Sequence, residues 1–177
     1  MKQTEMTPHH ERLLRCFTHL PQQILRLHEI DNATEYVLHS LCDEGFLNLQ
    51  KAAYFIDNPD FDCLKGIAGF SKEEGSNSCD IVLDDAGCFR EHVTQCGYNK
   101  KVRTINVPSA KRNGDSLEKI MERLAEKLGM SNPACHSWNI KHDNFGLLIF
   151  ERDESDERKL REEFIHGLSI LGFCPVS

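Results

Sequence analysis

The chain has 177 residues, which suits one domain with an additional arm and an apolar core of its own. Its formal net charge is -7 and the basic residues are scattered among acidic ones, which argues against nucleic acid or an anionic membrane as a partner. The eight cysteines form no CxxC pair, and the sequence shows no apolar leader or membrane-spanning run, so we expect reduced thiols in a cytoplasmic protein.

The first predicted element is a helix from His10 to Leu27. Its apolar residues recur four and three positions apart, as in a helix that buries a narrow seam. They are Leu13, Phe17, Leu20, Ile24 and Leu27. Pro21 lies inside this pattern, so the helix either kinks there or is followed by a second helix that begins there. We expect residues 1–30 to form a helical arm whose seam packs on its own domain or forms a dimer contact.

A second helix is predicted to begin at Asp31 or Asn32. Glu35 stands three residues after Asn32, which is the spacing of a capping box, and Gly45 is a natural stop. The expected buried face consists of Ala33, Val37, Leu38, Leu41 and Cys42.

A β-hairpin is predicted next, because the strand-like runs KAAYFI and CLKGIAGF flank the turn DNPD. Its core candidates are Tyr54, Ile56, Ile67 and Phe70. Gly66 and Gly69 indicate that the sheet bends at the second strand or that another part of the chain approaches it closely.

The middle of the chain alternates short elements. A polar loop covers residues 71–80, and a short strand is predicted from Ile81 to Leu83. A short helix then ends at Gly97, and the run KVRTINV is a further strand candidate.

The short helix before Gly97 carries Cys88, His92 and Cys96 at four-residue spacing. This spacing places two thiols and one imidazole on the same helix face. Such a row can line a ligand pocket, bind a metal ion or simply pack against the core.

The last third of the chain is predicted to contain a helix, a hairpin and a closing helix. The first helix begins at Asp115 or Ser116 and ends at Gly129. Its apolar stripe consists of Leu117, Ile120, Met121, Leu124 and Leu128. The runs CHSWNI and FGLLIFER form the hairpin across the turn KHDN. The closing helix has the apolar stripe Leu160, Phe164, Leu168 and Leu171.

This order of elements predicts an α+β fold, with one central antiparallel β-sheet flanked by helices. Three segments also resemble the GAF family of small-molecule-sensing regulatory domains. KAAYFIDNPDFDCLKGIAGFS is similar to the first hairpin of that family, and Ile81 through Gly87, Val93 and Gly97 is similar to its strand, glycine, helix and glycine segment. SWNIKHDNFGLLIFERDESDERKL resembles its final hairpin and terminal helix, with Gly146 at a usual glycine position.

The resemblance implies a GAF-like sensor domain at residues 31–172, followed by a tail at residues 173–177. Its terminal helices would cover one face of the sheet, and the short helix and loops would close a ligand pocket on the other. The implied pocket residues are Tyr54, Ile67, Cys88, Phe89, His92, Cys96 and Trp138. The implied function is a non-catalytic sensor of a small molecule that signals through its terminal helices.

The resemblance leaves the ligand and any cofactor open. It implies a homodimer formed through the terminal helices and an effector domain beyond this chain. The chain would then be either a fragment of a longer signalling protein or a stand-alone sensor.

Three alternatives concern the ligand. Cys88, His92 and Cys96 could bind zinc, iron or haem, although zinc needs a fourth ligand. The candidates for that ligand are Cys79, Cys135 and His136. A cyclic nucleotide is disfavoured, because Asn99-Lys100 and the run from Phe150 to Glu154 differ in position and interval from the motifs of cyclic-nucleotide-binding members. The neighbours of a bilin-attachment cysteine are absent as well.

Two further alternatives are enzymatic. Some proteins with this fold reduce free methionine sulfoxide, and Cys88, Cys96 and Cys135 could act as nucleophile and resolving thiols. The motifs that surround those cysteines in that family are missing here. The pair His142-Asp143 is also found in metal phosphohydrolases, but in this sequence it lies in a predicted turn, which explains it better.

Overall fold

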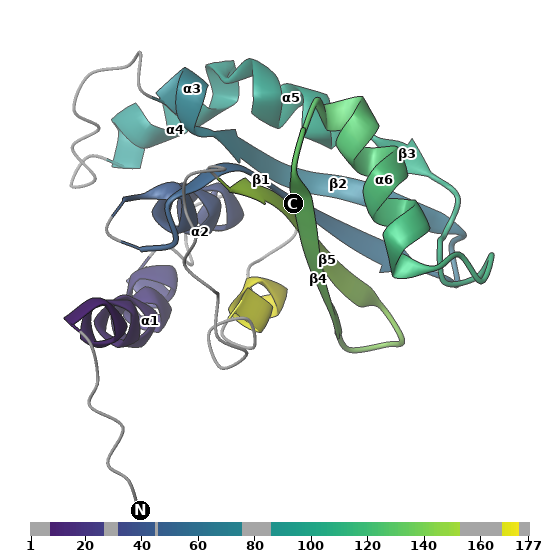
Figure 1. Ribbon diagram of the computed structural model, residues 1–177, viewed down its shortest axis with the longest axis horizontal. Helices are drawn as coiled ribbons and strands as arrows, with labels where there is room; N and C mark the ends of the chain where they lie inside the picture. Colours follow the sequence, from purple (N-terminus) through teal and green to yellow (C-terminus); the bar gives the residue numbers. More distant parts are fainter. Residues whose placement is uncertain (1–7, 27–31, 45, 76–85, 153–167, 174–177) are drawn as a thin grey trace, which may run out of the picture.

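The computed structural model describes residues 8–26, 32–44, 46–75, 86–152 and 168–173 (Figure 1). These residues form a five-stranded antiparallel sheet with the strand order β3-β2-β1-β5-β4. The strands are β1 Leu49–Asn58, β2 Cys63–Ser71, β3 Asn106–Val107, β4 Pro133–Asn139 and β5 Phe145–Arg152. Both predicted hairpins are therefore confirmed, and the α+β class is confirmed with them.

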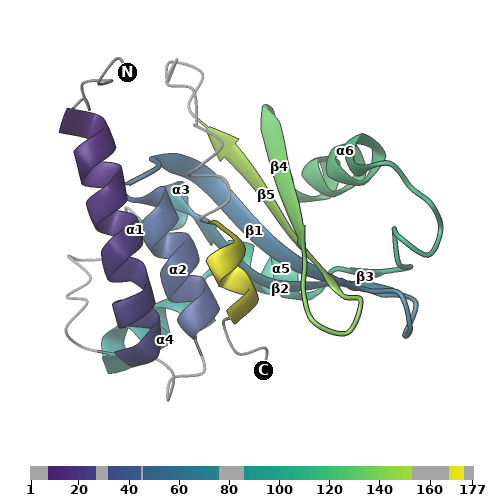
Figure 2. The ribbon, with the colours of Figure 1, turned by 90° about the horizontal axis from the view of Figure 1, so that it is seen from below.

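Helices lie on both faces of this sheet. They are α1 Pro8–Arg26, α2 Ala33–Cys42, α3 Lys72–Gly75, α4 Ala86–Gln95, α5 Gly97–Arg103, α6 Leu117–Leu128 and the 3-10 helix η1 Leu168–Phe173. In Figure 1, α5 and α6 lie above the sheet, and α1, α2 and η1 lie below it. Figure 2 shows α1, α2 and η1 side by side on that lower face.

The two central strands are buried on both faces, so each helps to build two apolar cores. Along β1, Tyr54 packs in the core beneath α1, α2 and η1, whereas Phe55 packs in the core beneath α5 and α6. Along β5, Leu148 and Leu147 divide in the same way. This division follows from the alternation of side chains along a strand.

Helix α1 runs without interruption through Pro21. Leu20 is buried in the core shared with α2, and the ring of Phe17 meets that of Phe46 edge-on with centroids 4.7 Å apart. The seam was predicted either to pack on its own domain or to form a dimer contact. Leu20 and Phe17 pack on their own domain. The side chains of Leu13, Ile24 and Leu27 lie outside the described residues.

Helix α2 buries all five residues that its pattern predicted. The predicted capping box is wrong, because the Asn32 side chain caps no backbone N–H. Glu35 instead forms an ion pair with Arg103 of α5 at 2.5 Å. The Glu35 side chain is only 2% exposed, and a guanidinium partner meets the needs of a buried carboxylate better than one backbone N–H would.

The strand predicted at KVRTINV is wrong over most of its length, because helix α5 covers its first residues. Residues Gly97–Arg103 are helical, and only Asn106 and Val107 pair with the sheet. A Cβ atom on Gly66 would lie 2.0 Å from the Val102 carbonyl oxygen, and one on Gly69 would lie 2.4 Å from Val102 Cγ2. The close approach predicted at these glycines is confirmed, and the space that they leave is filled by a helix rather than by a strand.

The remaining boundaries agree with local signals. Ser116 caps α6 by accepting a hydrogen bond from Lys119 N, and Gly129 ends it with φ 67. His142 and Asp143 lie in the turn between β4 and β5 with positive φ, as the turn prediction required. The predicted strand at residues 81–83 and most of the closing helix lie outside the described residues, but Leu168 and Leu171 are buried.

Candidate functional site

Three of the seven predicted pocket residues lie on the face that α1, α2 and η1 cover. Tyr54 and Trp138 stack with centroids 5.6 Å apart and an interplanar angle of 3°. Ile67 packs in the same core and is the extra residue of a β-bulge, since Tyr54 pairs with Ala68 and Phe55 pairs with Gly66. These aromatic and aliphatic contacts build the core beneath the terminal helices.

The predicted residues on α4 lie near α2. The Phe89 ring meets that of Tyr36 at 5.6 Å and that of His39 at 5.8 Å, and Val93 packs beside them. The described buried side chains of this helix thus pack against α2, and its predicted role as a pocket wall stays a prediction. His92 lies close enough to affect the titration of Glu74 and His39, and the Cys88 side chain lies outside the described residues.

Cys96, another of the seven predicted pocket residues, is the residue before α5 and is held by Glu74 of α3. Its Sγ donates to Glu74 Oε2 at 2.7 Å, and Tyr98 N donates to the same oxygen at 3.0 Å. Burial and the bond to Glu74 raise the pKa of Cys96 to about 11. Burial alone would raise the pKa of Glu74, but hydrogen bonds from Cys96, Tyr98 and Gly97 lower it below its ordinary value.

These contacts bear on the metal and thiol-enzyme alternatives. Over the part of the chain that the structure describes, no three or more His, Cys, Asp or Glu side chains are grouped as metal ligands. Burial, followed by the charge of Glu118, also raises the pKa of Cys135 on β4. Cys96 and Cys135 are thus held as protonated thiols, which weakens them as nucleophiles.

A cavity of about 360 Å³ lies on the face away from α1 and α2, between the sheet and the loop that leads into α6. This volume falls in the usual range for small-molecule sites. Its lining is Asp57, Leu64, Ala110, Lys111, Gly114, Asp115, Leu117, Ile120, Ser137, Phe145, Gly146 and Leu147. None of the seven predicted pocket residues lines it.

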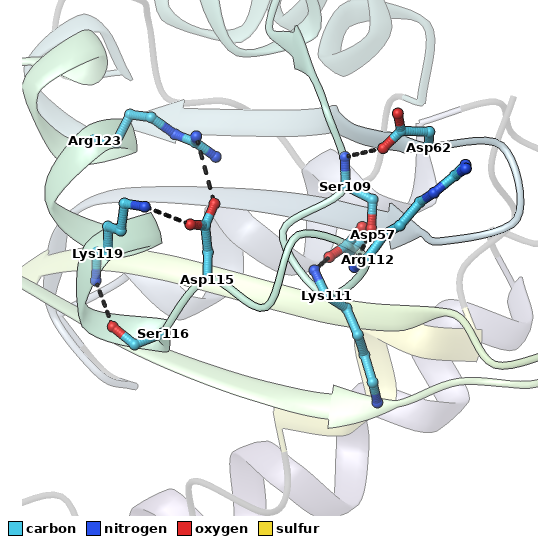
Figure 3. Close-up of polar contacts among 9 residues, drawn as sticks. All are labelled: Asp57, Asp62, Ser109, Lys111, Arg112, Asp115, Ser116, Lys119 and Arg123. Atoms are coloured by element: carbon cyan, nitrogen blue, oxygen red, sulfur yellow. Dashed lines mark hydrogen bonds and ion pairs between the residues drawn. The ribbon is translucent and has the colours of Figure 1, made fainter.

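Two aspartates of the first hairpin hold the loop over this cavity, as Figure 3 shows. Asp57 Oδ2 accepts from Lys111 N at 2.9 Å, and Asp62 Oδ1 accepts from Ser109 N at 3.1 Å. Ser109 Oγ accepts from Arg112 N at 3.1 Å and tightens the loop. The loop is therefore fixed to the end of β1 and to the start of β2.

The charges around the cavity differ in how fully they are paired. Asp115 accepts from Lys119 Nζ at 2.6 Å and lies 3.7 Å from Arg123 Nη1, and the Lys119 bond lowers the pKa of Asp115 (Figure 3). Lys111 Nζ lies 3.2 Å from the centroid of the Phe145 ring. Asp57 is only 5% exposed, and within the described part of the chain its Oδ1 has no hydrogen-bond partner.

Sequence reasoning missed Asp57, Lys111 and Phe145. The motif DNPD indicated only a turn, and the run SAKRNGD indicated only a loop. Asp57 and Lys111 are 54 positions apart, and neither segment carries a local signal that it meets the other. An aspartate directly after the apolar strand run KAAYFI was the available hint, and turn chemistry explained it equally well.

A second cavity of about 310 Å³ lies between α1 and α2. Its lining is Arg15, Cys16, His19, Leu20, Tyr36, His39, Ser40, Asp43 and Phe46. Burial lowers the pKa of His39, although the charge of Asp43 opposes this effect. His39 Nδ1 has no hydrogen-bond partner in the described ranges, but the residue is only half-buried. The cavity beside Asp57 offers the more deeply buried unpaired group.

The sequence matches no protein-family model, and comparison with curated proteins gives no match. Among solved structures, the chain is similar to the GAF domain of a phosphoenolpyruvate-protein phosphotransferase from Coxiella burnetii. The TM-score is 0.54 with 14% sequence identity, and the match covers 94% of this chain and 90% of that chain. The chain has the GAF fold.

At this identity the likeness to the GAF domain concerns the fold alone. It agrees with the resemblance that the sequence showed, and it extends over α1 as well as the sheet, because nearly the whole chain is aligned. None of the helices in the described ranges of this GAF fold is long and apolar enough to cross a membrane.

Proposed function

We propose that this chain is a non-catalytic sensory or regulatory domain that binds a small organic molecule in the cavity beside Asp57. The observation that carries the proposal is this cavity, on the sheet face away from α1, α2 and η1, with a buried carboxyl oxygen that has no hydrogen-bond partner among the described residues. An unsatisfied buried acceptor is costly, so a ligand that bonds it gains affinity.

Strand β1 offers a route from the cavity to the terminal helices. Asp57 is the last residue but one of the strand and lines the cavity, while Tyr54 of the same strand packs with α2 and η1 through the shared core. Because protein interiors are close-packed, a shift of β1 at one face is felt at the other. The ion pair between Glu35 and Arg103 connects α2 with α5 in addition.

The partner in this proposal is a second copy of the chain or an effector domain that contacts α1 and the closing segment. Leu14 on α1 is 44% exposed and available for such a contact. Binding at the cavity would then be read out through helices that lie on the other side of the sheet.

The test compares two tryptophan substitutions on consecutive residues of α6. Leu117 lines the cavity, whereas Glu118 is exposed and does not. A thermal-shift screen of a metabolite collection should find compounds that raise the Tm of wild-type protein by about 5 to 10 °C at about a hundred times their Kd. Leu117→Trp fills the cavity and should abolish these shifts, and Glu118→Trp should keep them.

Two results would contradict the proposal. One is a wild-type protein that no compound stabilises. The other is a stabilisation that survives Leu117→Trp, because the compound would then bind elsewhere, for instance between α1 and α2.

A further inference from the structure

The free oxygen of Asp57 limits what the cavity can bind. Its other oxygen is occupied by Lys111 N, and the residue is nineteen-twentieths buried, so bulk water is poorly placed to satisfy it. We infer that the ligand is an amine, an amidine or a similar donor with an apolar body, and that anions are rejected. This inference rests on the function proposed above.

The other charged side chains near the cavity support this preference for a donor over an anion. Lys119 and Arg123 do not line the cavity, and both lie beside Asp115, with Lys119 Nζ at 2.6 Å and Arg123 Nη1 at 3.7 Å from its carboxylate. The Lys111 ammonium lies over the Phe145 ring. Among the described residues Asp57 receives only a neutral backbone N–H, so no cationic side chain offsets its negative charge there.

The rest of the lining suits an apolar body rather than a second charged group. Leu64, Ile120 and Leu147 are buried side chains of the core beneath α6, and Leu117 adjoins them. A ring of benzene size with one donor group fits within about 360 Å³. Contacts with these side chains would bind the body, and Asp57 would select the head group.

Asp62 provides a matched control for Asp57. Each carboxylate lies at one end of the β1–β2 turn and accepts one backbone N–H of the same loop. Asp62 is exposed and does not line the cavity. Replacement by asparagine keeps an oxygen for the backbone N–H in both cases, but only Asp57→Asn changes the atom offered to a ligand from an acceptor to an amide donor.

The experiment titrates the full chain with benzamidine, benzamide and benzoate, which share a ring and differ in head group. Two-dimensional NMR follows the backbone amides of Lys111, Asp115 and Leu147 beside the cavity. Benzamidine should bind most tightly and benzoate about tenfold or more weakly, the ratio expected for one charge-assisted hydrogen bond. Asp57→Asn should weaken benzamidine about tenfold and leave benzoate unchanged, and Asp62→Asn should alter neither.

The contrary outcomes separate the two proposals. Benzoate that binds as tightly as benzamidine overturns the donor preference but keeps the cavity as a ligand site. A preference for benzamidine that Asp57→Asn leaves intact, or that Asp62→Asn removes equally, overturns the role of Asp57. If none of the three probes shifts the amides beside the cavity, both the ligand class and the proposed function are contradicted. The wild-type comparison decides the ligand class even if a variant fails to fold.

Discussion

Cys96 precedes α5, and its Sγ donates to Glu74 Oε2 from 2.7 Å away. The four-residue row of Cys88, His92 and Cys96 suggested that the thiols share one role, but this hydrogen bond and its burial give Cys96 a role in joining α3 to α5. The same carboxylate receives the first N–H groups of α5, where the helix dipole favours a negative charge. Glu74 is thus a capping residue that also suppresses ionisation of a neighbouring thiol.

We predict that Cys96 reacts slowly with iodoacetamide near neutral pH. With a pKa of about 11, roughly one thiol in a thousand is ionised at pH 8, and the thiolate is the reactive form. Glu74→Gln removes the negative charge and should move the midpoint of the pH–rate profile below that of wild type. Mass spectrometry of the Cys96 peptide measures the rate.

The neighbouring substitution Glu73→Gln is the control for this measurement and should leave the midpoint in place. A faster reaction without a shifted midpoint would mean that Glu74→Gln merely exposes the thiol. Fast alkylation of wild-type protein at pH 8 would contradict the prediction outright.

At the scale of elements, α5 depends on two glycines of β2. The backbone of Val102 contacts Gly66 and its side chain contacts Gly69. The helix therefore lies closer to the strand than a Cβ atom on either glycine would allow. Asn99 of the same helix accepts from Gly69 N at 2.9 Å through Oδ1, which fixes the helix along the strand. Glycine at these positions therefore decides that a helix covers β2 here.

We predict that alanine at these two positions destabilises the protein for different reasons. Gly69→Ala clashes with Cγ2 of Val102 and should cost about 1 to 3 kcal/mol. Gly66→Ala clashes with a backbone oxygen that has no room to yield, and should cost about 3 kcal/mol or more. Urea unfolding monitored by circular dichroism gives both free energies of unfolding.

A double variant distinguishes the two clashes. Val102→Ala removes Cγ2, so Gly69→Ala combined with Val102→Ala should cost less than the sum of the single changes. The same combination with Gly66→Ala should show much less relief, because the carbonyl oxygen at 2.0 Å remains. Equal relief at both glycines would show that the helix, rather than the side chain of Val102, is what moves.

At the scale of the whole molecule, two helical layers share one sheet, and polar contacts at its margins connect distant segments. Glu151 at the end of β5 is one such contact. It accepts from Ser131 N at 2.7 Å and pairs with Lys51 Nζ of β1 at 3.3 Å. It thereby holds the turn after α6 against both central strands.

We predict that Glu151 contributes to the loss of stability in acid. Burial alone would raise its pKa, but the N–H groups of Ser131 and Asn132 together with Lys51 lower it below the ordinary 4.5. A lowered folded-state pKa gives stability that is complete above pH 4.5 and is lost as the pH falls through the folded pKa. Glu151→Gln should therefore flatten the acid limb of the plot of unfolding free energy against pH.

The control for this prediction is Glu122→Gln on the exposed side of α6, which should leave the acid limb unchanged. Unfolding in urea at a series of pH values between about 3 and 6 provides the measurement. An acid limb equally steep in wild type and Glu151→Gln would show that the hydrogen bonds of this carboxylate add no stability.

Much of the fold could be predicted from local sequence. Strand alternation and turn residues located both hairpins, and the apolar stripes located α2 and α6, because those signals are carried by residues a few positions apart. The strand predicted at KVRTINV failed for the opposite reason, since the helix there is selected by the glycines of β2. The capping box at Glu35 failed because Arg103, 68 positions away, offers the carboxylate a stronger partner.

The candidate site was decided by tertiary structure alone. By itself the sequence determined an α+β chain with two hairpins and helices between them, because periodicity and turn signals depend on neighbouring residues. The likeness to GAF domains was a resemblance of three segments. The sequence could not show that Tyr54 and Trp138 lie beneath the terminal helices, or that Asp57 meets the loop of Lys111 across 54 positions. Which face a strand residue takes, and which distant backbone it meets, depends on the packing of the layers. The unpaired oxygen of Asp57 exists only once that packing is complete.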